Sequence, residues 1–259
     1  MLCKVDKIIS ILEEESLFLP NLVARLAEKK LIKHIIIYRK PFKLNQFKSK
    51  IREIFLVFGF KTGLNLFLSV LLAQVSNFLF KNRYYSIKKV SSRFDIPFTV
   101  VNKLNSKRVS NLIERLSPDI VFAQVGALIK SDLLQGNCFW NKHCSLLPSY
   151  KGVYPVFWGM LNNEPYLGVT IHQMDESFDT GPILSQSTIP NKSLTFFDAY
   201  HKLYDVTGDL IIDLLLHGKK HNSRHKACSS YYSFPDSSAR REFLKNNKFG
   251  FPFRLHPYV

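Results

Sequence analysis

The stretch from Lys7 to Tyr38, KIISILEEESLFLPNLVARLAEKKLIKHIIIY, indicates the fold of this chain. An apolar run from Lys7 to Leu12 predicts a buried strand, and a second run from Lys33 to Tyr38 predicts another. Between them, apolar residues recur at helical spacing across Leu17 to Lys30. Strand, helix and strand within about thirty residues form a βαβ unit, which argues for a parallel sheet.

The same alternation resumes after residue 96. Strands are expected at Pro97–Val101, Asp119–Gln124 and Cys138–His143, with helices over Ser106–Leu116 and Ser193–Leu216. The pattern predicts an α/β fold, a mostly parallel sheet with flanking helices. Open α/β sheets carry their sites at the carboxyl ends of strands, where Asn141 and His143 fall.

Composition narrows the class of protein. The chain has 259 residues, which suits one domain plus an appendage. Its four cysteines (Cys3, Cys138, Cys144 and Cys228) form no CxxC pair and follow no secretory signal. They are interpreted as reduced thiols of a cytoplasmic protein, without a disulfide framework or a metal site.

The formal net charge is +16, which attracts polyanions such as nucleic acid, acidic membrane surfaces or phosphorylated substrates. No RNP-like or helix-turn-helix pattern accompanies the basic residues, so nucleic acid is an unfavoured partner. His217, His221 and His225 recur every four residues. No carboxylate or thiol completes a ligand set there, and a solvated basic patch is preferred to a metal site.

Three groups suited to acyl-type transfer lie between residues 140 and 186. Asn141 and His143 are two apart on an expected strand, so both side chains face one side. Asp179 follows in the turn-like segment Asp-Thr-Gly. Taken singly, His143 suits a core histidine and Asp179 a turn residue. Cys144 beside His143 faces the other way, which disfavours a thiol nucleophile.

Two motif blocks favour a catalytic role for these three residues. Asn141 to Pro148 reads Asn-x-His-x-Ser-Leu-Leu-Pro and is followed by Tyr150-Lys151-Gly152; Gly168 to Gly181 reads Gly-Val-Thr-Ile-x-x-Met-Asp-x-x-x-Asp-Thr-Gly. Together they resemble the signature of formyltransferases that use N10-formyltetrahydrofolate. The resemblance covers roughly residues 85 to 215. Cys144 replaces a usual proline and Lys151 a usual arginine, and neither change removes a catalytic group.

The resemblance implies a Rossmann-like fold and a one-carbon transferase. In it, Asn141, His143 and Asp179 would be the catalytic residues, N10-formyltetrahydrofolate the formyl donor, and no metal would be needed. The pterin pocket would be lined by two segments: Ala127, Leu128 and Ile129, and Met174, Asp175 and Phe178. The resemblance also implies a cis peptide bond between Leu147 and Pro148.

Two features that the sequence lacks reduce the number of candidate acceptor amines. Glu13-Glu14-Glu15-Ser16 contains no glycine, and its carboxylates would repel a phosphate, which disfavours glycinamide ribonucleotide. The tail after residue 218 is too short for the β-barrel of methionyl-tRNA formyltransferases. An amino sugar on a nucleotide carrier is therefore the leading acceptor. Open alternatives are methionyl-tRNA formyltransferase-like activity, formyltetrahydrofolate hydrolysis, and a non-enzymatic, membrane-associated or scaffolding role.

Residues 41–84 interrupt the pattern and predict a helical insertion within a catalytic domain of residues 1–218. Residues 219–259 form a basic C-terminal extension. Thr62 to Phe80 is nineteen residues without a charge and has a polar stripe. We expect it to pack its apolar side on the body or on a second chain of a homodimer, with Leu66, Val70 and Phe78 largely buried. Peripheral membrane contact is the alternative; a span would divide the sheet.

Overall fold

The computed structural model describes residues 7–81, 83–218, 220–221 and 228–255. Its main sheet has seven strands in the order β3-β2-β1-β4-β5-β7-β8. They are β1 (Ile8–Glu13), β2 (Ile32–Tyr38), β3 (Phe98–Val101), β4 (Ile120–Gln124), β5 (Phe139–His143), β7 (Tyr166–Gln173) and β8 (Ile183–Pro190).

Strands β1 to β5 run parallel to one another, and β7 and β8 are antiparallel additions beside β5. The predicted α/β fold with a mostly parallel sheet is confirmed. Two short strands, β6 (Lys151–Gly152) and β9 (Tyr231–Tyr232), pair in parallel as a separate sheet.

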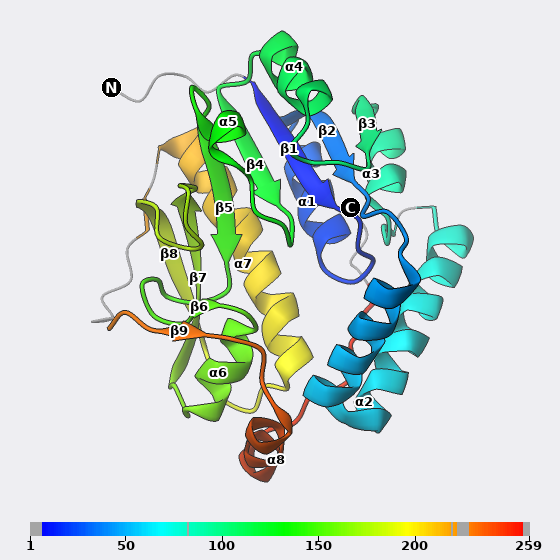
Figure 1. The fold of residues 1–259 in the computed structure, drawn as a ribbon, viewed down its shortest axis with the longest axis vertical. Coiled ribbons are helices and arrows are strands. Elements are labelled where there is room, and N and C mark those ends of the chain that lie inside the picture. The colour runs from blue at the N-terminus through cyan, green and yellow to red at the C-terminus, as the bar shows by residue number, and fades with distance from the viewer. Residues whose placement is uncertain (1–6, 82, 219, 222–227, 256–259) are drawn as a thin grey trace.

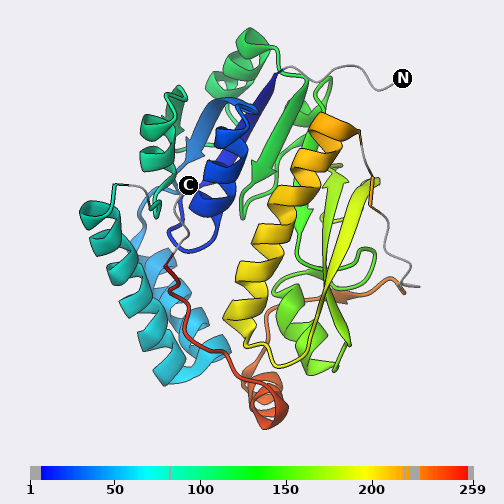
Figure 2. The same ribbon diagram turned by 180° about the vertical axis from the view of Figure 1, so that it is seen from behind.

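Helices cover both faces of the main sheet (Figure 1 and Figure 2). Helices α1 (Leu19–Glu28), α3 (Ile87–Arg93) and α7 (Phe196–His217) lie on one face, and α4 (Lys107–Leu116) and α5 (Ser131–Leu134) on the other. Alternate strand residues supply the two cores: Leu12, Ile35 and Phe122 face α1 and α7, whereas Ile11, Ile36 and Val121 face α4. This alternation is the physical reason why the apolar strands are continuous runs.

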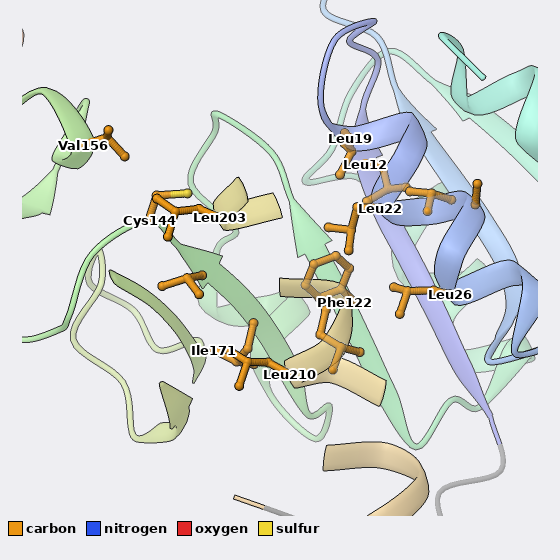
Figure 3. Packing of buried hydrophobic residues seen from close by; sticks show 14 of the residues in the cluster. Leu12, Leu19, Leu22, Leu26, Phe122, Cys144, Val156, Ile171, Leu203 and Leu210 are labelled. Carbon is orange, nitrogen blue, oxygen red and sulfur yellow. The ribbon is translucent and has the colours of Figure 1, made fainter. Parts of the chain in front are cut away.

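The larger core joins α1 to the sheet. Leu19, Leu22 and Leu26 project from α1 toward Leu12 and Phe122 (Figure 3). All five side chains are at most 2% exposed. Their three- and four-residue spacing on the helix is the pattern that predicted α1, and burial of each contributes roughly 2 kcal/mol.

The insertion forms a single assigned helix, α2 (Leu44–Leu79), with non-helical angles at Gly59 (φ 75°, ψ 173°). The chain reverses there, so that arms 44–58 and 60–79 lie side by side (Figure 1). Few residues other than glycine adopt these angles. At Gly63 the arms meet so closely that a Cβ would lie 2.9 Å from the Phe55 ring. The helical insertion is thus confirmed, but as a hairpin.

The predicted orientation of the second arm is wrong. Val70 and Phe78 are 38% and 89% exposed, and Leu66 is only partly buried. The buried positions of the second arm share small side chains: Gly63, Ser69, Ala73 and Ser76.

Close packing against the body explains the observed orientation of the second arm. Ala73 packs against Leu17 and Tyr85. The Ser69 hydroxyl accepts a hydrogen bond from the Phe253 N–H at 3.1 Å. Small residues permit this approach and hydroxyls satisfy backbone donors, so Leu66 is a bulky side chain of this arm that packs only partly against the body.

The end of the chain contributes to the main core. Helix α8 (Ser237–Asn246) packs near α6 (Pro155–Leu161), and Phe243 and Phe249 are 0% and 3% exposed among other aromatic rings. The Arg240 guanidinium donates to the carbonyls of Phe55 and Leu56 at 2.8 and 2.6 Å, where the first arm of α2 ends. The division of the chain into residues 1–218 and 219–259 stays a prediction.

Candidate active site

Strand β5 separates its side chains onto two faces. Asn141 and His143 face one side, and Lys142 faces the other, over the Tyr204 ring of α7 at 3.5 Å from its centroid. Cys144 joins the Lys142 side, with its Sγ 3.4 Å from Lys142 Nζ, and lies beside Leu203 (Figure 3). Burial lowers the pKa of Lys142. This arrangement agrees with the alternation that disfavoured a Cys144 nucleophile.

The structure brings Asp179 to His143. Asp179 Oδ1 lies 3.4 Å from His143 Nδ1, and its Oδ2 accepts a hydrogen bond from the Gly152 N–H at 3.0 Å. The other ring nitrogen of His143, Nε2, is 2.7 Å from the Tyr150 carbonyl, to which it can donate. The imidazole is therefore fixed from both sides, a carboxylate at one nitrogen and a backbone acceptor at the other.

The Asn141 amide is oriented by its own backbone. Its Oδ1 accepts a hydrogen bond from the Lys142 N–H at 2.8 Å. Because a backbone N–H can only donate, this contact identifies the amide oxygen and leaves the NH₂ group as donor. Within residues 7–81, 83–218, 220–221 and 228–255 that NH₂ group makes no hydrogen bond.

Burial controls the charge of the imidazole. It lowers the pKa of His143, while the Asp179 carboxylate and the hydrogen bond to Tyr150 act in the opposite direction. The net shift is downward, so His143 is neutral at pH 7 and able to accept a proton. A neutral histidine beside a carboxylate is suited to general base catalysis.

A second histidine, His172, belongs to the same cluster and is absent from the sequence prediction. Its Nε2 lies 3.7 Å from Asp179 Oδ1, so the carboxylate sits between two imidazoles. Burial also lowers the pKa of His172. The antiparallel register pairs His172 with Asn141 and Thr170 with His143. The signal was the alternation of β7, which places residues 170 and 172 on one face.

Residues with positive φ angles cluster at this site. Tyr150, Gly152 and Asp179 have positive φ angles of 57°, 94° and 57°. Such angles are uncommon for residues other than glycine and gather at functional sites, where surrounding contacts hold them. The Leu147–Pro148 bond is cis, as predicted.

Three of the six residues predicted to line a pterin pocket share one hydrophobic core. Ala127, Ile129 and Met174 pack on the smaller core beside β5. Leu128 and Phe178 are 44% and 57% exposed.

Asp175 accepts hydrogen bonds from the Ser177 N–H at 3.1 Å and the Thr180 hydroxyl at 2.6 Å, and so shapes the loop before Asp179. The role of these six residues in cofactor binding stays a prediction.

Two of the three regularly spaced histidines can be placed at the end of α7. His221 Nε2 lies 2.6 Å from Asp213 Oδ2, His217 ends α7, and His225 lies outside the described residues. Among the residues that the structure describes, no three His, Cys, Asp or Glu side chains group as a metal site.

The turn after β1 contains the side chain of Glu15, which occupies the start of α1. The Glu15 carboxylate accepts hydrogen bonds from the N–H groups of Leu17 and Phe18 at 2.8 and 2.9 Å, and from that of Leu19. These donors open α1, the position where a helix can bind a phosphate. Burial raises the pKa of Glu15, against the effect of the backbone donors.

Comparison with known proteins agrees with this geometry. Residues 48–211 match the family model "Formyl transferase". The methionyl-tRNA formyltransferase of Thermosipho melanesiensis is 36% identical over 131 residues, which are 50% of this chain and 43% of that protein. The chain thus spans less than half the length of this relative.

Solved structures share the fold. Phosphoribosylglycinamide formyltransferase from Bacillus halodurans superposes with a TM-score of 0.54 at 18% identity, covering 81% of this chain and 93% of that one. WlaRD, a sugar 3N-formyltransferase solved with dTDP and 5-N-formyl-THF, gives 0.51 at 19% identity, covering 87% and 69%. From the family match and the cluster at the end of β5, this chain belongs to the formyl transferase family.

Proposed function

We propose that the chain transfers a formyl group from N10-formyltetrahydrofolate to a primary amine. The observation that carries the proposal is the cluster at the end of β5, in which Asn141, His143 and Asp179 come together. Formyl transfer requires a donor for the formyl oxygen and an acceptor for the amine proton, and this cluster contains both.

The Asn141 amide is the group best placed as the donor. Its NH₂ is uncommitted in the described part of the chain, whereas the His143 Nε2–H faces the Tyr150 carbonyl. Negative charge develops on the formyl oxygen as the amine attacks, and a fixed donor there contributes about 3 kcal/mol.

The His143–Asp179 pair is the proposed proton acceptor. With Nε2–H facing the Tyr150 carbonyl, the lone pair of the neutral imidazole is on Nδ1, which takes the proton from the attacking amine, directly or through one water. Asp179, 3.4 Å from Nδ1, stabilises the imidazolium that results. The proton then passes to N10 of the folate as the bond between N10 and the formyl carbon breaks, which releases tetrahydrofolate. Gly152 holds the carboxylate in place through its N–H at 3.0 Å. The donor cosubstrate supplies the formyl group, and the segments 127–129 and 174–178 are proposed to line its pterin pocket.

An amino sugar on a nucleotide carrier is the proposed acceptor. Glu15 fills the start of α1, which supports exclusion of a phosphate from that turn. Near Gly152, the Tyr232 ring stacks on Tyr150 and on Trp158, with centroid distances of 5.3 and 4.8 Å. Half-buried aromatic rings of this kind suit a base or sugar ring. Burial and a hydrogen bond to Glu164 raise the pKa of Tyr150 to about 12, which keeps its hydroxyl protonated.

Methionyl-tRNA is the second candidate acceptor. It is favoured by the name of the relative at 36% identity, and a net charge of +16 suits a polyanion. The first candidate, the nucleotide-linked amino sugar, is a small-molecule acceptor, and with it we propose a cytoplasmic location.

A panel of acceptors separates these proposals. Purified protein and N10-formyltetrahydrofolate are incubated with nucleotide-linked amino sugars, methionyl-tRNA, glycinamide ribonucleotide or buffer alone, and the formyl mass gain is measured. Modification of the amino sugars supports the first candidate. Formylation of methionyl-tRNA alone would replace it with the second, and folate turnover without any acceptor would indicate hydrolysis.

A further inference from the structure

The second arm of α2 exposes a face of large apolar side chains. Phe67 and Phe78 are 71% and 89% exposed. They form, with other exposed apolar residues of this arm, what we call the outer face of α2: Phe60, Leu64, Phe67, Leu71 and Phe78. Contiguous apolar surface of this kind marks an interaction site.

Basic residues flank the outer face along the chain. Residues 41–83 contain seven Lys or Arg and a single Glu, a net charge of +6. Lys61 and Lys81 flank the second arm, and the other basic residues are Lys43, Lys48, Lys50, Arg52 and Arg83. The one acidic group, Glu53, is engaged by Lys50 at 2.7 Å and by the Tyr154 hydroxyl at 3.3 Å. An apolar face with a basic border is complementary to an anionic bilayer.

We propose that the outer face of α2 docks the protein peripherally on an anionic lipid bilayer. The aromatic and aliphatic side chains enter the interface, and the surrounding lysines and arginines contact the headgroups. A second copy of the chain is a poorer occupant, because a self-complementary contact would place two segments of charge +6 against each other.

The hairpin determines how α2 meets the membrane. By length and composition α2 could cross a bilayer. The reversal at Gly59 and the charges of the first arm instead keep α2 at the surface, with both ends on the side of the sheet (Figure 1). The sheet therefore remains whole.

The docked face and the candidate active site share one end of the molecule. Helix α2 lies at the carboxyl ends of the parallel strands, as the site does (Figure 1). Phe58 of the first arm packs edge-on against Tyr154, two residues after Gly152. Docking thus holds the active site near the lipid surface.

Vesicle flotation with the full chain tests the proposal. Vesicles of phosphatidylcholine are compared with vesicles that contain one third phosphatidylglycerol, since about 1 kcal/mol of attraction is expected per basic residue near an anionic surface. The test variant is Phe67→Ser with Phe78→Ser. The matched control is Leu216→Ser with Leu244→Ser, two apolar residues that are each 50% exposed.

We expect binding to the anionic vesicles, weakened at least tenfold in the test variant and unchanged in the control. Raising salt should also weaken it. Absence of binding, or equal loss in test and control variants, would overturn the proposal. If light scattering showed that the parent protein is a dimer and the test variant a monomer, and neither bound vesicles, the outer face would be assigned to contact between copies. Thermal unfolding of each variant verifies that the fold is retained.

Discussion

The side-chain orientation of two segments, strand β5 and the second arm of α2, was predicted from residue spacing, and only the prediction for β5 held. In β5, Asn141 and His143 share a face and Lys142 takes the other. In α2, Ser69 and Ala73 face the body and Phe78 faces outward. The two segments differ in how many neighbours determine their orientation.

A strand inside a sheet has both faces defined by its partners. β5 pairs with β4 on one side and β7 on the other, so a rotation would break both ladders. The second arm of α2 contacts the body along one stripe and the first arm near Gly63, and many of its other side chains are exposed. For such a helix, steric fit of small residues can outweigh burial of large ones, and the hydrophobic pattern alone does not identify the inner face.

The largest expected effect is at β5. His143→Ala or Asn141→Ala should lower kcat/KM for formyl transfer about 10² or more, because each removes a group acting on the reacting atoms. Initial rates with the acceptor found in the panel measure it. His221→Ala, a histidine outside the cluster, is the control and should retain activity. Near-normal rates in either β5 variant would remove the catalytic role.

Asp179→Asn should have a smaller effect on rate and a distinctive effect on pH dependence. Turnover should fall about tenfold. Because the carboxylate raises the pKa of His143 against burial, its loss should lower that pKa further. The acid limb of the kcat/KM profile should therefore move to lower pH. A profile and rate identical to the parent protein would leave Asp179 as a turn residue only.

In α2 the inner face should be the sensitive one. Ala73 is fully buried, so Ala73→Leu should overpack its contact with Tyr85 and Leu17 and cost about 1–3 kcal/mol of unfolding free energy. Denaturant unfolding measures the change. If Ala73→Leu were as stable as the parent, the second arm would not pack on the body through its small residues.

The exposed side chains of the second arm should show the smallest effect. Val70→Lys and Phe78→Ser change side chains that are 38% and 89% exposed, so each should alter unfolding free energy by less than about 0.5 kcal/mol. Denaturant unfolding again measures the change in unfolding free energy. A loss of about 2 kcal/mol at Phe78 would restore the orientation first expected from the sequence.

Most of the fold was predictable because it rests on local patterns. The βαβ unit of residues 7–38, the strands near residues 98, 120 and 139, and the long helix α7 all follow from apolar runs and spacing. The reversal at Gly59 was missed because the apolar run continues on both sides of the glycine. A sequence period does not report a change of chain direction.

The candidate site was predictable in its side chains and not in its backbone. Asn141, His143 and Asp179 follow from spacing and resemblance, and the structure places them together. The contacts of Tyr150 and Gly152 are made by a carbonyl and an N–H, which every residue carries and no pattern distinguishes. The three N–H groups that donate to Glu15 likewise depend on where α1 begins.

The hairpin of α2 also has a consequence for chain entropy. It lengthens the connection between β2 and β3 to about sixty residues, of which about forty belong to the insertion. Loop-closure entropy grows only with the logarithm of length, so the added residues cost about 1 kcal/mol in bringing the two strands together. That cost is small against the folding free energy of a domain of this size. The sheet can therefore carry a long crossover whose outer surface is shaped by other demands than its own stability.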